Sequence, residues 1–180
     1  LYEGETVDFL TWGVQSSMID HLMLGWVMYT LNRSAIVFTS HRVLLLRVDG
    51  RGRPRDLVSQ IRYDAIAQVK RSLFGATLLV TRGGKKIAFE KVAKPDRKFM
   101  QQTLESLQSS GKLESSGVME KEDLCPHCWI PVEGRPEACA SCGGEFKSIR
   151  AARIRSLIFP GLGDWYLGHR GFAVMEMAGA

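Results

Sequence analysis

The sequence has no cysteine beyond the four that form two Cys-x-x-Cys pairs. This pattern is typical of a metal site in a reducing compartment and disfavours a secreted scaffold held by disulfides. Residues 1–10 carry three acidic residues and lack the basic stretch that opens a secretory signal peptide. We therefore expect the cysteines to lie on the cytoplasmic side.

A convincing catalytic combination is also missing. The histidines are scattered and none has a neighbouring nucleophile motif. Gly50 and Gly52 lack the rest of a phosphate-loop fingerprint, so they indicate a turn. A metalloenzyme would need an open coordination position, which four cysteines around one ion do not leave. We predict that the protein is not an enzyme. The four histidines are His21, His41, His127 and His169.

Acidic residues are scarce in one part of the chain. Residues 41–112 contain sixteen Lys and Arg against six Asp and Glu, a net charge of +10, whereas the whole chain carries +5. Residues 113–148 are acidic, with a net charge of −4. The concentrated basic charge indicates either an anionic partner or a solvated surface.

The composition, with 45% hydrophobic and 24% charged residues, is that of a folded protein. Four segments are predicted: a first domain over residues 1–112, a polar linker over 113–122, a cysteine module over 123–148, and a basic lead-in with an apolar tail over 149–180. The sequence ends within an apolar stretch, and we expect it to be a piece of a longer protein.

Short β-type runs separated by turn signals dominate the first domain. Residues 77–81 and 85–89 predict the clearest hairpin, with two glycines at its tip. A helix should have Pro95 in its first turn and present Phe99, Met100, Thr103, Leu104 and Leu107 on one face. This is a mainly β class with a C-terminal helix, predicted to form a small barrel or bent sheet plugged by that helix. Residues 15–31 fit a helix only partly.

Four sequence stretches of the first domain resemble the bacterial pleckstrin-homology-like (PH-like) domains. They are YEGETV (2–7), VFTSHRVLLL (37–46), IRYDAIAQV (61–69) and the glycine-turn hairpin with its following helix. The resemblance implies a bent antiparallel barrel capped by a helix, of a kind that binds lipid or protein. Fold alone does not give function.

The clearest site is formed by Cys125, Cys128, Cys139 and Cys142. Two Cys-x-x-Cys loops can present four thiolates to one tetrahedral ion, and Zn²⁺ accepts this set well. Iron is possible on ligands alone. The segment is similar to a short zinc ribbon, and the site is predicted to be structural. His127, inside the first loop, is predicted to be a bystander.

Arg51, Arg53 and Arg55 form the sharpest binding hypothesis, because arginine bonds phosphate in forked geometry. They are predicted to share one loop with Gly52 and Pro54 and to bind anionic lipid or another anion. The alternative is an exposed loop without a ligand. Nearby basic pairs at residues 70–71 or 85–86 are predicted as further members of the patch.

The tail stretch FPGLGDWYLGHRG (159–171) is similar to the Pro-Gly-Leu-Gly and Tyr-x-Gly pattern of small two-helix bacterial membrane domains. Phe159, Trp165 and Tyr166 are predicted membrane contacts, since aromatic side chains suit the headgroup region. We expect a broken, membrane-seeking hairpin whose second arm continues beyond Ala180. The alternative is a soluble helix and loop packed on the barrel.

Together these features predict a non-catalytic, membrane-associated binding or adaptor protein with one structural zinc ion, whose partner is a membrane lipid, a membrane protein or another protein. The alternative is a soluble regulatory protein that binds nucleic acid or a protein through the basic barrel and ribbon. Nucleic acid is the less favoured partner, because aromatic residues do not interleave with the basic ones in the sequence.

Overall fold

The computed structural model describes residues 3–16, 29, 32–49, 51–72, 75–109, 121–134 and 136–179, without the side chains of residues 54–57 and 108. The chain divides into two compact units, Leu1–Pro131 and Val132–Ala180. This boundary falls within the 123–148 segment predicted as a ribbon. Residues 113–120 of the predicted linker, and most of residues 15–31, lie outside the described residues.

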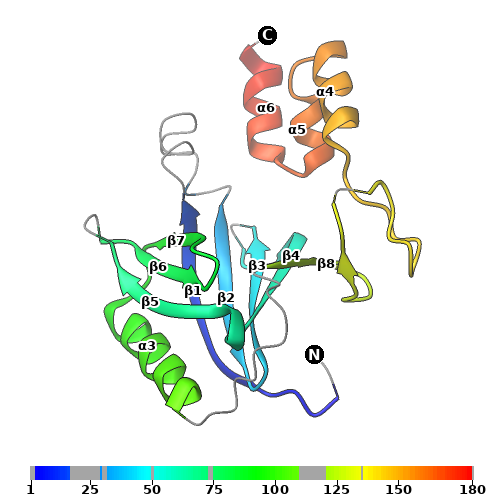
Figure 1. Cartoon of the computed structure of the whole chain (residues 1–180). Coiled ribbons are helices and arrows are strands. Elements are labelled where there is room, and N and C mark those ends of the chain that lie inside the picture. Colours follow the sequence, from blue (N-terminus) through cyan, green and yellow to red (C-terminus); the bar gives the residue numbers. More distant parts are fainter. Residues whose placement is uncertain are drawn as a thin grey trace. The chain divides into compact units, whose positions relative to one another are not determined.

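Nine strands of the described residues form one antiparallel sheet in the order β5-β6-β7-β1-β2-β3-β4-β8-β9 (Figure 1). The predicted mainly β class is confirmed, but the sheet is open, with β5 and β9 at its edges. The strands are β1 (Val7–Ser16), β2 (Arg33–Thr39), β3 (Arg42–Val48), β4 (Pro54–Arg62), β5 (Ile66–Arg71), β6 (Thr77–Thr81), β7 (Lys86–Glu90), β8 (Glu122–Leu124) and β9 (Pro131–Val132).

The predicted hairpin is confirmed by β6 and β7. Leu79 pairs with Ile87, and the Thr81 N–H donates to the Lys85 carbonyl at 2.9 Å. Gly84 lies in this turn with a φ of 85°, a left-handed conformation that glycine adopts without a steric penalty.

The predicted helix is α3 (Lys94–Ser109), which lies beside β5 in Figure 1. Met100 and Leu104 are buried in the main core, while Phe99 is only partly covered and stacks on Phe9 with ring centroids 4.2 Å apart. Burying these apolar side chains is the principal stabilising term for the unit. Besides the two helix residues, this core contains Ile36, Phe38, Val43, Leu45, Ile61, Tyr63, Ala65, Ile66, Val69, Leu79, Ile87 and Phe89.

A second apolar cluster involves strands β2, β3, β4 and β8. Successive side chains of a strand point to opposite faces, so the strands β2 to β4 supply residues to both clusters. Leu124 of β8 is 3% exposed and belongs to this cluster, and Trp129 packs against it. The other buried members are Ala35, Val37, Leu44, Val48 and Val58.

A network of buried polar side chains connects the N-terminal segment to β8. Arg42 forms an ion pair with Glu5 at 2.9 Å, and both side chains are almost fully inaccessible to solvent. The Arg42 guanidinium also donates to the side-chain oxygen of Gln60, whose amide nitrogen donates to Glu122. Because buried charges are costly without partners, these contacts specify the position of β8 as well as that of the N-terminal segment.

Two further polar contacts lie near this network. The Ser59 hydroxyl donates to the Asp123 carboxylate at 2.7 Å, again joining β4 to β8. The Tyr63 hydroxyl donates to the Thr39 carbonyl at 2.6 Å. Burial, with a smaller contribution from the negative charge of Asp8, raises the pKa of Tyr63 far above its ordinary value.

The described residues of the second unit form three short helices, α4 (Ile149–Ile158), α5 (Leu162–Leu167) and α6 (Arg170–Gly179). The predicted break in the tail is confirmed between α4 and α5. Gly161 has a φ of 87°, and a Cβ there would lie 2.5 Å from the Ala173 carbonyl oxygen. A Cβ on Gly163 would lie 2.6 Å from the Ala152 carbonyl oxygen. Glycine is therefore required where α5 approaches its two neighbours.

No helix in the described part of the chain is both long enough and apolar enough to cross a bilayer.

Candidate metal centre

The first cysteine pair follows directly from β8, which positions it. Val58 pairs with Leu124 in the sheet, and the chain then turns through Cys125. The Cys125 N–H donates to the Ile130 carbonyl, and the Trp129 N–H donates to the Cys125 carbonyl, each at 2.9 Å. These bonds close a tight loop around the pair, so the sheet fixes one side of the site.

The second pair lies on a short hairpin whose strands meet at a single bridge, Ala138 to Glu145. The Cys139 N–H donates to the Gly144 carbonyl at 2.8 Å, and the Gly143 N–H donates to the Cys139 carbonyl at 2.9 Å. Gly143 has a φ of 69°, a left-handed conformation that glycine adopts without a steric penalty in the turn after the second pair.

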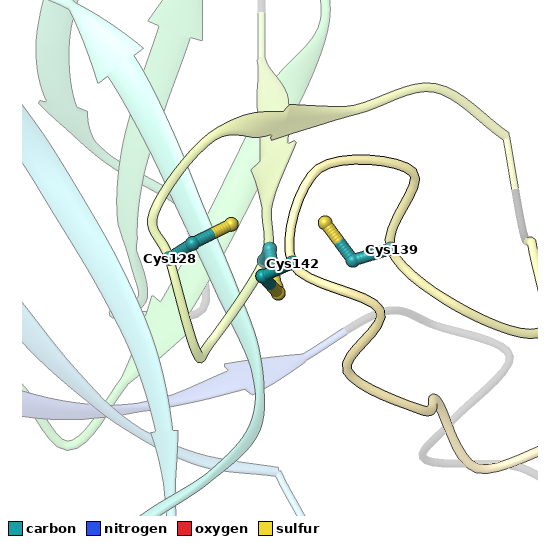
Figure 2. A group of neighbouring side chains, drawn as sticks. Cys128, Cys139 and Cys142 are labelled. Atoms are coloured by element: carbon teal, nitrogen blue, oxygen red, sulfur yellow. The ribbon is translucent and has the colours of Figure 1, made fainter.

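The four sulfurs come together at one point. The Sγ atoms of Cys125, Cys128, Cys139 and Cys142 all lie within 4.8 Å of one another. In Figure 2 the sulfurs of Cys128 and Cys139 point toward one another, and Cys142 is drawn between them. Cys125 and Cys139, the first cysteine of each pair, are buried, and Cys142 is exposed. The predicted clustering of the four cysteines is therefore confirmed.

This arrangement fits a tetrahedral zinc ion. Zn–S bonds of about 2.3 Å place four sulfurs about 3.8 Å apart, a spacing that small inward movements would reach. The His127 N–H points at the Cys125 Sγ at 3.4 Å, a contact that stabilises negative charge on sulfur. The four thiolates would hold the ion and leave it no position for water or substrate, so its chemistry would be structural.

His127 is exposed and is not a member of the sulfur group. In the described residues, the cysteines form the one group of three or more His, Cys, Asp or Glu side chains positioned to hold a metal ion.

Arg51 and Arg53 lie in the loop between β3 and β4, and both are exposed. The Asp49 carboxylate accepts their backbone N–H groups at 2.8 and 2.9 Å, which shapes the loop without using either guanidinium. Arg55 is the second residue of β4, and its side chain lies outside the described residues. The basic pairs at 70–71 and 85–86 are exposed as well.

The predicted membrane contacts lie in different surroundings within the second unit. Phe159 is 45% exposed and Trp165 is 50% exposed. Tyr166 is more covered: its hydroxyl accepts the Ser148 N–H at 3.1 Å, and the Arg155 guanidinium lies 3.7 Å from its ring centroid. Tyr166 therefore has a packing role that the sequence did not indicate.

One open cleft of about 600 Å³ is found in the second unit, lined in part by Glu137, Glu145, Arg150 and Ser148. Its one hydroxyl, that of Ser148, accepts the Ala151 N–H at 3.4 Å as the N-cap of α4. Among the described residues, that hydroxyl makes no hydrogen bond to Glu137 or Glu145, the two carboxylates of the cleft.

Sequence reasoning missed Leu124 and Trp129 as residues that position the site. Leu124 completes a buried cluster formed by strands distant in the sequence, and Trp129 packs on the same cluster. The apolar character of Leu124 and Trp129 was the available signal, but their partners are more than sixty residues away in strands β2 to β4.

Comparisons with protein-family models, curated proteins and solved structures find no match for this chain. The resemblances to PH-like domains, zinc ribbons and two-helix membrane domains therefore stay predictions.

Proposed function

We propose that the protein is a non-catalytic binding or adaptor protein that carries one structural zinc ion and associates with the cytoplasmic face of a membrane. In this proposal residues 1–112 are a PH-like module and residues 123–148 a short zinc ribbon. The observation that carries it is the convergence of four cysteine sulfurs within 4.8 Å, a ligand set with no open position. In this proposal the closed site is structural and keeps the ribbon folded.

The zinc part of the proposal is tested by native mass spectrometry of the purified chain. We expect one zinc ion per chain, and iron would be recognised by its mass and its visible absorption. The Cys139→Ser variant should lose the ion, because three thiolates bind zinc much more weakly than four. A metal-free chain in which residues 136–146 are nevertheless protected from hydrogen exchange would contradict a structural metal.

The membrane part is supported by apolar side chains on the surface of the second unit. Leu157 is 87% exposed, Ile158 73% and Met175 65%. Such large aliphatic side chains at the surface indicate a contact that covers them. Arg150 and Arg153 on α4 are exposed too, which suits the anionic face of a membrane.

Carbonate extraction of membranes that contain the full-length protein tests this association. We expect the wild-type protein to stay with the membrane and a variant with Leu157→Ser, Ile158→Ser and Phe159→Ser, called the tail variant below, to be released. Ile130→Ser, which changes an apolar residue of the first unit that is 45% exposed, as Phe159 is, is the control and should not be released. Release of the wild-type protein would contradict the proposal.

The proposed lipid contact of the first unit is the loop with Arg51 and Arg53, continued by Arg55. Each basic residue near an anionic surface contributes about 1 kcal/mol, so this loop alone would bind only weakly. Its binding should fade as salt rises, because the Debye length falls to about 3 Å at 1 M.

A further inference from the structure

The β3–β4 loop, which carries Arg51 and Arg53, approaches an exposed tryptophan from a different part of the chain through Gly52. A Cβ on Gly52, at the tip of that loop, would lie 3.6 Å from Trp12 Cη2. Trp12 belongs to β1, 39 residues before Arg51 in the sequence. The fold therefore brings an aromatic side chain to the basic loop, which the sequence pattern did not predict.

A third arginine and a second apolar side chain extend this group. Arg33 of β2 pairs with Val14 of β1, and its guanidinium carbon lies 5.8 Å from the Trp12 ring centroid. Leu10 lies two residues before Trp12 and therefore on the same face of β1. Leu10 is 47% exposed and Trp12 is 40% exposed. Arg33 is exposed as well.

We propose that this surface, formed by Leu10, Trp12, Arg33, Arg51 and Arg53 and called the β1 surface below, binds an anionic lipid bilayer. The inference rests on the proposed membrane association and assigns that role to Leu10, Trp12 and Arg33.

The combination of residue types favours a bilayer over a nucleic acid. Tryptophan suits the headgroup interface, because its indole has a large apolar body and one N–H donor. Leucine adds aliphatic surface that enters an acyl layer but offers no stacking plane for a base. The arginines beside them can donate forked hydrogen bonds to lipid phosphates. The nearby Asp49 carboxylate already accepts the backbone N–H groups of the loop.

The test measures vesicle binding in the full-length tail variant, so that binding left after the loss of Leu157, Ile158 and Phe159 reports the first unit. Vesicles of phosphatidylcholine mixed with phosphatidylserine are compared with vesicles of phosphatidylcholine alone. We expect residual binding to the anionic vesicles only. In this background Trp12→Ala should weaken it by roughly fivefold or more, because apolar contact area is lost.

Charge reversal gives a matched pair of variants. Arg51→Glu with Arg53→Glu should weaken residual binding by roughly tenfold or more. Lys85→Glu with Lys86→Glu makes the same change in net charge on the β6–β7 turn and should weaken it by less than about threefold. Circular dichroism and zinc content check that each variant is folded, which is expected because the changed residues are exposed.

The outcomes separate the inference from the proposed function. Three outcomes would each contradict lipid binding by the β1 surface and leave the tail association intact. They are a tail variant without residual vesicle binding, a Trp12→Ala variant with unchanged vesicle affinity, and equal losses of affinity from the two charge reversals. The chain has four tryptophans, so the emission of Trp12 is taken as the part that Trp12→Ala removes. Quenching of that part by a single-stranded oligonucleotide, with no effect of vesicles, would overturn the inference in favour of nucleic acid. Release of the wild-type protein by carbonate would instead contradict the proposed function itself.

Discussion

The two cysteine loops share one backbone pattern but differ in the residue that closes the turn. In each loop the first cysteine donates its N–H to the carbonyl five residues later and accepts the N–H of the residue four positions later. That fourth residue is Trp129 in the first loop and Gly143 in the second, with φ angles of 63° and 69°. Glycine adopts this conformation freely, whereas a tryptophan there is strained.

The packing around Trp129 explains why the strain is tolerated. Trp129 contacts the second apolar cluster, and the preceding strand β8 is paired with β4 and contributes the buried Leu124. In the described residues, the second loop belongs to a short hairpin with one bridge, Ala138 to Glu145, and a hydrogen bond from the Phe146 N–H to the Glu137 carbonyl at 2.8 Å. The difference teaches that the sheet holds the first loop, whereas the second loop would depend chiefly on bonds from its thiolates to the proposed zinc ion.

Removing the proposed metal should produce the largest difference in stability between the two loops. Structural zinc contributes apparent binding free energies of about 10–16 kcal/mol in zinc-finger peptides, so a module that depends on it unfolds without it. After chelation we expect the amides of Cys139, Gly143 and Phe146 to exchange at least a hundredfold faster, a loss of roughly 3 kcal/mol of local stability. The amide of Leu124, in the sheet, should keep most of its protection.

Hydrogen exchange read by NMR with and without chelator measures this directly. Re-addition of zinc, which should restore the second loop, is the control. Equal loss of protection at Leu124 and Cys139 would show that both loops depend on the metal alike.

Truncating one apolar side chain on each loop gives a smaller effect. Leu124→Ala removes a side chain that is 3% exposed, and such substitutions cost about 2–5 kcal/mol of unfolding free energy. Phe146→Ala removes a half-buried side chain next to the second pair and should cost less than half as much. Denaturant unfolding of the zinc-loaded variants compares them. A larger loss of unfolding free energy in Phe146→Ala than in Leu124→Ala would contradict the inference that apolar packing stabilises the first loop more than the second.

Several features could be predicted from the sequence because their causes are local. Cys-x-x-Cys spacing was enough to predict the sulfur cluster, since each loop needs only its own few residues to aim two thiols. The β6–β7 hairpin follows from its glycine turn, and α3 from its apolar spacing. The break after Ile158 follows from Pro160 and Gly161 in the same way.

Other features could not be predicted, because they depend on residues far apart in the chain. The pairing of β8 with β4 joins Leu124 to Val58, and no periodicity within either strand specifies that register. The approach of Gly52 to Trp12 depends likewise on the order of β1, β2 and β3 in the sheet. The sequence alone therefore predicted a loop of arginines but not the tryptophan beside it.

The smallest expected effect comes from the closing residue of the second loop. A Cβ on Gly143 would meet no atom within 4 Å, so Gly143→Ala changes only the conformational cost of a positive φ. That cost is about 1–2 kcal/mol, which corresponds to roughly a tenfold weaker zinc affinity if the turn forms only with the metal. Competition with a chromophoric chelator measures the affinity.

Gly134→Ala is the matched control for this last change. Gly134 also has a positive φ, 70°, and open space around its Cβ, but it lies outside both cysteine loops. Gly134→Ala should lower the unfolding free energy by a similar amount without changing the zinc affinity. An unchanged affinity in Gly143→Ala would mean that the turn tolerates a side chain at this position. Trp129 would then carry little strain, and the contrast between the loops would rest on packing against the sheet alone.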